Sequence, residues 1–394
     1  MFILIMSLKG FTFGTVCFDE PRAIYYAGQT LSGTIKFDIE LPVTFTAIKA
    51  HYSGHASVSW NEDQSEKYGG VERVRIINYV GNELYINNEQ YVLGTGAPTL
   101  LPAGPHTIKF SYQLPYNIPS SFNGEKGSIK YCMTAYLEYP EGHHDKLTAD
   151  FDIVDPLDLN TIECLRKPIE TEYDEVSSCN MFCQSQPIII KIVVPVGGYC
   201  PGQTIPIGIQ AQNDSSVEVT RIKFQLIQRV RYHSTHPRST YVTPEEVLES
   251  ASQGPIMSHT KRSLTCPLRV PDIIAYNTQA CGIIEVAYFI KMLIKMSGCV
   301  DNCEDDHEIR LGLIPIQETL TDSYVHPLSH LLPTAPIPKA NMNYSQNGEV
   351  QKNVNENDSG FRQYDIGFKV PGLPLLPLVT VGSNIPQPSA PPLP

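Results

Sequence analysis

Two pairs of cysteines have the spacing and the chemistry of metal ligands. Cys179 and Cys183 are separated by three residues, and Cys299 and Cys303 repeat this spacing later in the chain. Four thiolates from two loops would bind zinc tetrahedrally if the loops meet. A CxxxC spacing is weaker evidence than CxxC, so we favour reduced, unliganded thiols. A thiol- or zinc-linked regulatory binding protein stays open as an alternative, and no other cofactor is expected.

Short proline motifs near the C-terminus have a different chemistry, that of peptide ligands. Pro333-Thr334-Ala335-Pro336 and Pro388-Ser389-Ala390-Pro391 fit the P[ST]AP pattern of late-domain motifs. Ubiquitin-E2-variant domains of the endosomal sorting machinery recognise this pattern. Proline presets φ, so a polyproline II segment loses little entropy on docking, and two weak motifs on one chain gain avidity. The alternative is a generic proline-rich linker, which would make the protein a scaffold with an inert tail.

A further proline motif overlaps the second of these. Pro391-Pro392-Leu393-Pro394 resembles a ligand of WW domains, such as those of WW-domain ubiquitin ligases. Because Pro391 belongs to both motifs, it cannot serve both partners at once.

Basic side chains alternate with apolar ones between residues 221 and 231. Arg221, Lys223, Arg229 and Arg231 occupy odd positions, whereas the even positions are mostly apolar. In a strand this alternation places the four cations on one face. The face would suit phosphoinositide headgroups, and hence peripheral membrane contact, or acidic cargo tails. The alternative, which we favour, is a solvated face whose cations pair with nearby Glu and Asp.

Enzyme motifs are missing from the sequence. There is no Gly-x-Ser-x-Gly elbow, P-loop, Gly-x-Gly-x-x-Gly or His-Glu-x-x-His. His143-His144-Asp145 lies in a Gly- and Pro-flanked hairpin turn, which favours an exposed loop. We therefore expect a protein that is not an enzyme.

An internal repeat positions these groups. At an offset of 174 residues, nine of 25 gap-free positions are identical, which indicates two domains of one design. The best-preserved part is Tyr25 with Gly28-Gln29-Thr30, which recurs as Tyr199 with Gly202-Gln203-Thr204. After each copy, apolar and polar residues alternate, as in strands with one buried face. Short strands separated by Gly, Pro and Asn turns indicate β-sandwiches.

Further strands are expected throughout both repeats, and the segments between them define the domains. We predict strands at Val71–Val80, Thr107–Leu114, Ser128–Glu138, Lys146–Val154, Ile188–Val194, Arg221–Tyr232, Gly282–Lys295 and Glu308–Ile316. The predicted organisation is an N-terminal sandwich (7–156), an interdomain connection (157–186), a C-terminal sandwich (187–317) and a tail (318–394). Residues 317–394 contain twelve prolines and a long polar run, a composition that predicts disorder.

Bulk composition limits the partners and the compartment. The net charge of −12 argues against nucleic-acid binding, which needs a basic footprint. No apolar stretch approaches the ~18 residues of a membrane span, and the apolar residues 1–6 are too short for a signal peptide core. We therefore expect a cytoplasmic protein with reduced thiols.

The sequence resembles a known family. Four stretches are similar to motifs of arrestin-domain proteins of the α-arrestin type, in the same order and spacing: Tyr25–Gly33, Gly54–Trp60, Leu114–Tyr131 and Arg310–Ile316. The resemblance covers about residues 7–317. It implies an all-β fold of two tandem arrestin-type, immunoglobulin-like β-sandwiches followed by a disordered proline-rich tail.

The resemblance also implies a function and one departure from it. Such proteins connect membrane-protein cargo to ubiquitylation or endosomal sorting, at the plasma membrane and endosomes. Typical members carry Pro-Pro-x-Tyr motifs that bind WW domains of ubiquitin ligases. Here Tyr324, Tyr344 and Tyr364 follow Ser323, Asn343 and Gln363, so none completes that motif. None of these tyrosines therefore provides the usual motif for recruiting a ligase.

Overall fold

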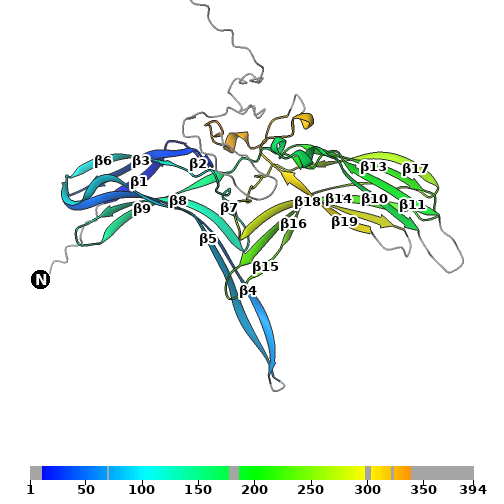
Figure 1. Ribbon diagram of the computed structural model, residues 1–394, viewed down its shortest axis with the longest axis horizontal. Coiled ribbons are helices and arrows are strands. Elements are labelled where there is room, and N and C mark those ends of the chain that lie inside the picture. The colour runs from blue at the N-terminus through cyan, green and yellow to red at the C-terminus, as the bar shows by residue number, and fades with distance from the viewer. Residues whose placement is uncertain (1–10, 69–70, 177–185, 298–302, 321–323, 339–394) are drawn as a thin grey trace, which may run out of the picture.

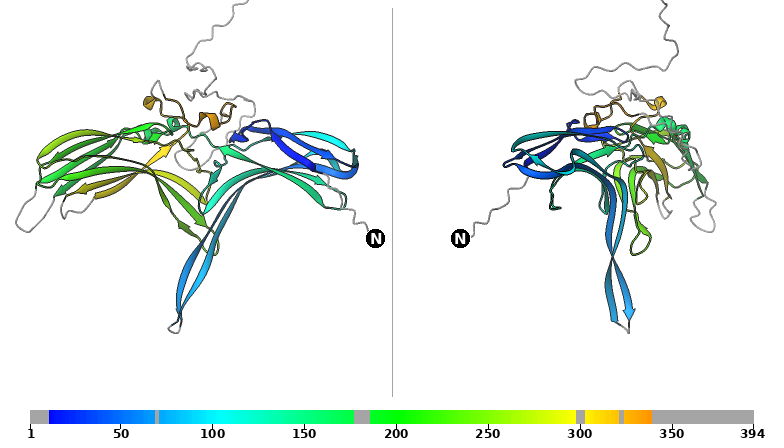
Figure 2. Two further views of the ribbon diagram at one scale, coloured as in Figure 1. Left: turned by 180° about the vertical axis from the view of Figure 1, so that it is seen from behind. Right: turned by 60° about the vertical axis from the view of Figure 1, so that its left-hand side comes forward.

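Two β-sandwiches lie end to end and form a wide V, with one long hairpin projecting from the region where they meet (Figure 1). The same arrangement is seen from behind and in an oblique view (Figure 2). This computed structural model describes residues 11–68, 71–176, 186–297, 303–320 and 324–338. The predicted all-β class with two tandem sandwiches is confirmed.

The N-terminal sandwich consists of a small and a large sheet. The small sheet has the order β1-β3-β6, with β1 at Thr12–Phe18, β3 at Thr30–Ile39 and β6 at Gly104–Gln113. The large sheet has the order β2-β9-β8-β4-β5, with β7 (Phe122–Asn123) paired to β8. Its strands are β2 (Ile24–Tyr26), β9 (His144–Val154), β8 (Gly127–Glu138), β4 (Val43–Tyr68) and β5 (Val71–Leu101).

The C-terminal sandwich repeats this plan. Its four-stranded sheet has the order β10-β11-β13-β17, with strands at Ile169–Val176, Pro187–Val194, Thr204–Asn213 and Thr260–Arg269. Its large sheet has the order β12-β19-β18-β14-β15, with β16 also paired to β14. These strands are β12 (Gly198–Tyr199), β19 (Cys303–Leu311), β18 (Ile284–Met296), β14 (Val219–Ser234), β15 (Thr240–Val242) and β16 (Glu245–Gln253). Short 3₁₀ turns η1 to η4 cover Leu159–Thr161, Glu163–Arg166, Gln317–Thr319 and Ser329–Leu331.

The alternation read from the sequence is the alternation of burial. In β3, Leu31, Ile35 and Phe37 face the core, and in β13 the isoleucines at 205, 207 and 209 do the same. The polar residues between them are exposed or partly exposed. One buried face per strand is therefore what holds each pair of sheets together.

The repeated Gly-Gln-Thr forms the same turn in both domains. Gly28 has φ +80° and Gly202 has φ +83°, a backbone region that side chains with a Cβ rarely adopt. The side-chain oxygen of Gln29 accepts a hydrogen bond from Tyr26 N (2.9 Å), and that of Gln203 accepts one from Cys200 N (2.7 Å). The repeat is thus a local turn that starts β3 and β13.

The projecting hairpin is made by β4 and β5. These strands have 26 and 31 residues, well beyond the usual strand length. β4 pairs with β8 only from Ala47 to Val58, so its outer part pairs with β5 alone. Val74 and Ile76 of β5, which pair with this outer part, are 62% and 67% exposed.

The strands of the structure differ from the predicted strands at several places. β10 lies within the segment assigned to the interdomain connection, where acidic residues alternate with half-buried Ile169, Thr171 and Tyr173 and form an edge strand. β19 covers Cys303–Leu311, so it begins and ends five residues before the strand predicted at Glu308–Ile316. The strands β16 and β17 were not predicted.

Candidate functional site

The two domains meet in a junction of aromatic and backbone contacts. The Phe122 ring lies edge-on to the Tyr276 ring, with centroids 5.0 Å apart. Ser120 N donates to Asn277 O (3.0 Å) and Ser120 Oγ accepts from Asp155 N (2.9 Å). The base of the hairpin joins them, because Val80 pairs with His236 of the C-terminal domain. One continuous core therefore runs through both domains.

A buried carboxyl group lies in this junction. Asp155 Oδ2 accepts a hydrogen bond from Asn277 Nδ2 (2.9 Å). Burial raises the pKa of Asp155 to about 7, because the charged form is poorly solvated there. The sequence offered no signal for this pair, since the two residues are 122 positions apart. The contact is between the end of one sandwich and a loop of the other.

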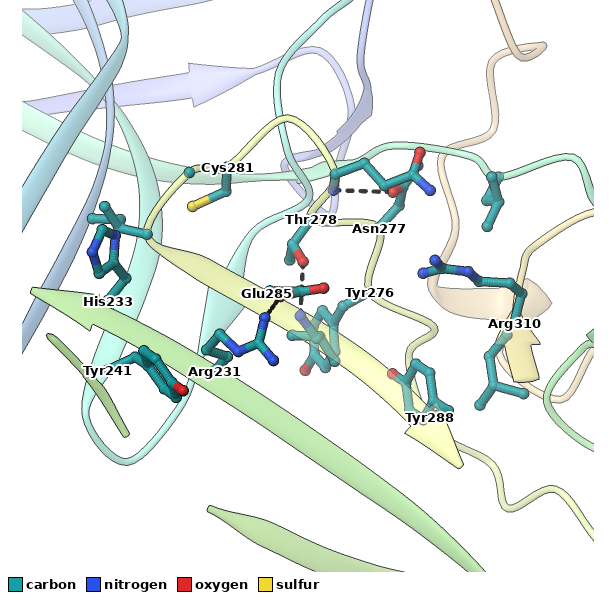
Figure 3. A pocket seen from close by; sticks show the side chains of 16 residues that line it. Arg231, His233, Tyr241, Tyr276, Asn277, Thr278, Cys281, Glu285, Tyr288 and Arg310 are labelled. Carbon is teal, nitrogen blue, oxygen red and sulfur yellow. Dashed lines mark hydrogen bonds and ion pairs between the residues drawn. The ribbon is translucent and has the colours of Figure 1, made fainter. Parts of the chain in front are cut away.

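A polar cavity of about 400 Å³ opens beside the junction (Figure 3). Its charged groups are mostly neutralised within the chain: Arg231 pairs with Glu285 (3.0 Å) and Arg310 with Glu308 (2.9 Å). Burial raises the pKa of the Cys281 thiol, which keeps it protonated and unreactive at neutral pH. The cavity therefore shows no activated nucleophile.

A second cavity, about 490 Å³, is lined largely by apolar side chains and lies between the domains. Its walls include Tyr131, Phe151 and Tyr276 from the sandwiches. Leucines of residues 324–338, at positions 328, 331 and 332, also line it. This segment crosses the junction, and we call residues 324–338 the strap.

The strap is the part of the predicted tail that the structure describes, and it is packed against the domains. His326 and Ile337 are 2% and 6% exposed, and Tyr324 OH donates to Pro201 O (3.0 Å). Its leucines and Ile337 provide apolar area that the proline content concealed. The remaining tail residues, 339–394, lie outside the described residues.

The first late-domain motif lies inside the strap. Pro333 is buried, whereas Thr334 and Pro336 are exposed and Ala335 is partly exposed. Thr334 Oγ1 donates to Glu20 Oε2 (2.8 Å), and Thr334 N donates to the same oxygen (3.4 Å). Glu20 itself is 8% exposed and was not singled out from the sequence. In the sequence, Glu20 stands out only as an acidic residue in the turn before the Tyr25 repeat.

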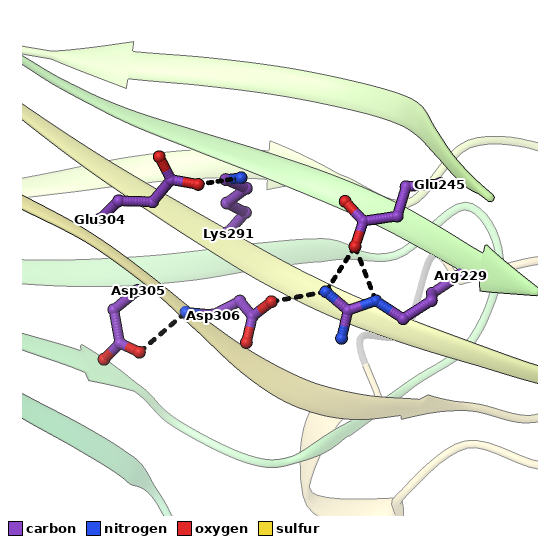
Figure 4. A network of polar contacts seen from close by, with 6 residues as sticks. All are labelled: Arg229, Glu245, Lys291, Glu304, Asp305 and Asp306. Atoms are coloured by element: carbon purple, nitrogen blue, oxygen red, sulfur yellow. Dashed lines mark hydrogen bonds and ion pairs between the residues drawn. The ribbon is translucent and has the colours of Figure 1, made fainter. Parts of the chain in front are cut away.

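The basic face of β14 is partly neutralised (Figure 4). Arg229 binds Glu245 (2.6 Å) and Asp306 (2.7 Å) and stacks on the Phe289 ring at 3.9 Å. Arg231 pairs with Glu285. In the described part of the chain, neither Arg221 nor Lys223 has an ion-pair partner. The four cations therefore divide into a paired end and an unpaired end.

The remaining predicted site residues are largely outside the described residues. These are Cys179, Cys183 and Cys299 of the candidate zinc site and all of Pro388–Pro394. Cys303 is described at the start of β19. Within the described ranges, no cluster of three or more His, Cys, Asp or Glu side chains is arranged for a metal ion. Over the same ranges, no helix combines the length and apolar character that crossing a bilayer requires.

Comparison with known proteins supports the fold and adds the family. Residues 14–160 match the family "Arrestin (or S-antigen), N-terminal domain", and residues 184–316 match "Arrestin (or S-antigen), C-terminal domain". Mouse Arrestin domain-containing protein 4 is 26% identical over 290 residues, covering 72% of this chain and 68% of the relative.

Two other relatives are similar over a comparable length. Human Arrestin domain-containing protein 1 is 22% identical over 281 residues, covering 71% of this chain and 60% of its own length. Caenorhabditis elegans Arrestin domain-containing protein 17 is 25% identical over 294 residues, covering 72% and 67%. The chain therefore belongs to the arrestin family, among the arrestin-domain-containing proteins of the α-arrestin type.

Proposed function

We propose that this protein is a trafficking adaptor without catalytic activity. Its two sandwiches capture membrane-protein cargo on the cytoplasmic side of the plasma membrane and endosomes. Its C-terminal segment passes the cargo to the endosomal sorting machinery. Family membership supports the adaptor role.

The proposed transfer of cargo to the sorting machinery rests on the pair of P[ST]AP tetrapeptides that follow the second sandwich. One of them, Pro333–Pro336, lies at the junction, and the other, Pro388–Pro391, lies close to the C-terminus. A ubiquitin-E2-variant domain is the partner class whose groove fits this pattern. The overlapping Pro391–Pro394 would allow a WW-domain ubiquitin ligase to compete for the same proline, which links the protein to ubiquitylation.

The test is binding of the chain to an E2-variant domain beside a panel of WW domains. We expect binding in the micromolar range by wild type. A variant with Pro333→Ala, Pro336→Ala, Pro388→Ala and Pro391→Ala should lose it. Binding that survives all four substitutions, or is absent in wild type, would contradict the proposal and favour a scaffold with an inert tail.

The unpaired end of the basic face supports a second, membrane-directed contact. Arg221 lies opposite Lys295 in the sheet, and Lys223 lies two residues further on the same face. Three cations close together in an acidic protein would attract anionic lipid headgroups. We expect Arg221→Ala with Lys223→Ala to reduce sedimentation with phosphoinositide vesicles several-fold. The matched control is Lys36→Ala with Lys109→Ala, two exposed lysines of the other domain. Equal loss in both variants would assign the effect to net charge alone.

A further inference from the structure

The strap is attached to both domains. Near its start, Tyr324 OH donates to Pro201 O in the C-terminal domain, and Pro327 lies beside the Gly202 turn. Near its end, Ile337 packs with Tyr26 of the N-terminal domain and with Leu313 and Ile314. Between these anchors the leucines line the apolar cavity of the junction. The strap is therefore part of the contact between the sandwiches.

The late-domain motif lies between the two anchors and has a polar attachment of its own. Glu20 Oε2 accepts both the hydroxyl and the backbone N–H of Thr334. The other carboxylate oxygen, Oε1, is 3.8 Å from Arg22 Nε. A buried carboxylate needs hydrogen-bond donors in place of water. Thr334 is thus a favourable partner for Glu20, and Glu20 fixes the motif in position.

A polyproline-binding domain would have to contact the same residues that are packed in the strap. Such a domain surrounds its ligand and contacts the proline rings and the residues between them. Here Pro333 is buried against this chain, Thr334 is bound to Glu20, and Ile337 directly after the motif is 6% exposed. The motif cannot enter a groove while its flanks are held in the junction.

We propose that the strap masks the Pro333–Pro336 motif, and that the motif becomes available when the strap leaves the domain junction. This inference rests on the proposed function, in which the motif binds an E2-variant domain. Because the strap has one anchor on each sandwich, a change in the angle between the domains strains it. Cargo that rearranges the domains would thereby release the motif, which couples capture to hand-over.

Masking lowers the apparent affinity by the fraction of chains in which the motif is free. We therefore expect the full chain to bind more weakly than a peptide with the same motif. Pro388→Ala and Pro391→Ala are introduced first, so that only the first motif reports. The dissociation constant for an E2-variant domain is then measured for this chain and for a synthetic peptide of residues 330–340.

Removing the polar attachment should unmask the motif. In the same background, Glu20→Ala removes the acceptor of Thr334 and should tighten binding about tenfold, toward the affinity of the peptide. Glu141→Ala is the matched control, since Glu141 lies in an exposed turn of the same domain. Ile337→Ala loosens the strap and changes no residue of the sandwiches. The same substitution in the peptide corrects for any direct effect on binding to the partner. Thermal unfolding confirms that each variant is folded.

The outcomes separate the two proposals. A peptide that does not bind overturns the proposed function of this motif, and the inference with it. A peptide that binds, together with a full chain that binds equally well and is unchanged by Glu20→Ala and Ile337→Ala, overturns the masking alone. A weak full chain that both variants strengthen, and Glu141→Ala does not, supports it.

Discussion

The Gly-Gln-Thr turns of the two domains have the same geometry but different covers. In the N-terminal domain, the turn is covered by Tyr116 from a loop of the same domain, and a Cβ on Gly28 would be 2.3 Å from its ring. In the C-terminal domain, the equivalent turn is covered by Pro327 of the strap, 3.0 Å from a Cβ on Gly202. Thr319 adds a hydrogen bond from Gln203 Nε2 (3.1 Å).

This difference shows how a duplicated domain acquires a new contact. The first copy closes its turn with its own residues, whereas the second uses a segment that follows the repeat. The C-terminal domain therefore depends on a part of the chain that also carries a candidate motif. We therefore expect the turn of the N-terminal domain to be self-contained and that of the C-terminal domain to depend on the strap.

Gly28→Ala should have the largest effect on folding. The new Cβ requires an unfavourable positive φ and displaces the Tyr116 ring, at a combined cost of about 2 to 3 kcal/mol. Urea unfolding measures it. Gly142→Ala is the control, since Gly142 has φ +84° with nothing within 4 Å of a Cβ, so it reports the backbone cost alone. Equal losses in both variants would show that Tyr116 does not matter as a cover.

Asp155→Asn tests the junction at a position where the domains differ. Tyr25 pairs with Ile153 and Tyr199 pairs with Leu311, so Asp155 corresponds to Leu313 of the second domain. The pKa of Asp155 is raised to about 7 in the folded protein, so the folded state holds its proton more tightly than the unfolded chain. Stability should therefore fall as pH rises from about 4 through 7.

The asparagine variant cannot ionise, so it removes this pH dependence of stability. It keeps an oxygen that accepts a hydrogen bond from Asn277. Unfolding in urea at several pH values should show wild type losing about 3 kcal/mol across the window, with a flatter profile in Asp155→Asn. Parallel profiles would mean that Asp155 is ionised in the folded protein.

Gly202→Ala should cost less than Gly28→Ala, about 1 kcal/mol, because Pro327 is at 3.0 Å and the strap can shift. Its distinctive effect is on the strap rather than on the sandwich. We expect faster limited proteolysis within residues 324–338, while Gly28→Ala leaves that rate unchanged. Equal cleavage rates in wild type and Gly202→Ala would show that the C-terminal turn does not depend on the strap.

Lys49→Met and Lys223→Met form a repeat-related pair with the smallest effects. Lys49 Nζ is 2.9 Å from both Glu89 and Glu138, whereas Lys223 has no ion-pair partner among the described residues. Loss of the bridged lysine should cost up to about 1 kcal/mol at low salt and less at high salt, because these partners are partly exposed. Lys223→Met should be neutral in unfolding experiments, and a comparable cost would point to a partner beyond the described residues.

The sequence was most informative where structure depends on neighbouring residues. The repeat, the turns and the buried faces of β3 and β13 all follow from local chemistry, and each was predicted. β16 was not, because Glu245–Gln253 is polar on both faces and has no alternation to read. β10 was hidden for a similar reason, since its acidic residues suggested a connection.

The strap and its acceptor could not be predicted for a different reason. The apolar residues of the strap are separated by prolines, and their burial depends on a cleft that exists only when both domains are folded. Glu20 and Thr334 are 314 positions apart, and neither is unusual in its local sequence. Long-range pairing of this kind has no periodicity in the sequence. The packing of the strap against the domains could therefore not be predicted from the composition of the segment after residue 317.

The length of the β4–β5 hairpin has a mechanical consequence. From Asn61 to Tyr68, β4 pairs only with β5. This part therefore reaches roughly 26 Å beyond the sandwich at about 3.3 Å per residue. Its base is held between the domains by the pairing of Val80 with His236. The hairpin is therefore a lever whose fulcrum is the domain junction. A relative rotation of about 10° there would carry the tip through roughly 4 Å, given that rise per residue. Small changes in the angle between the two domains would therefore produce larger displacements at the tip of the hairpin.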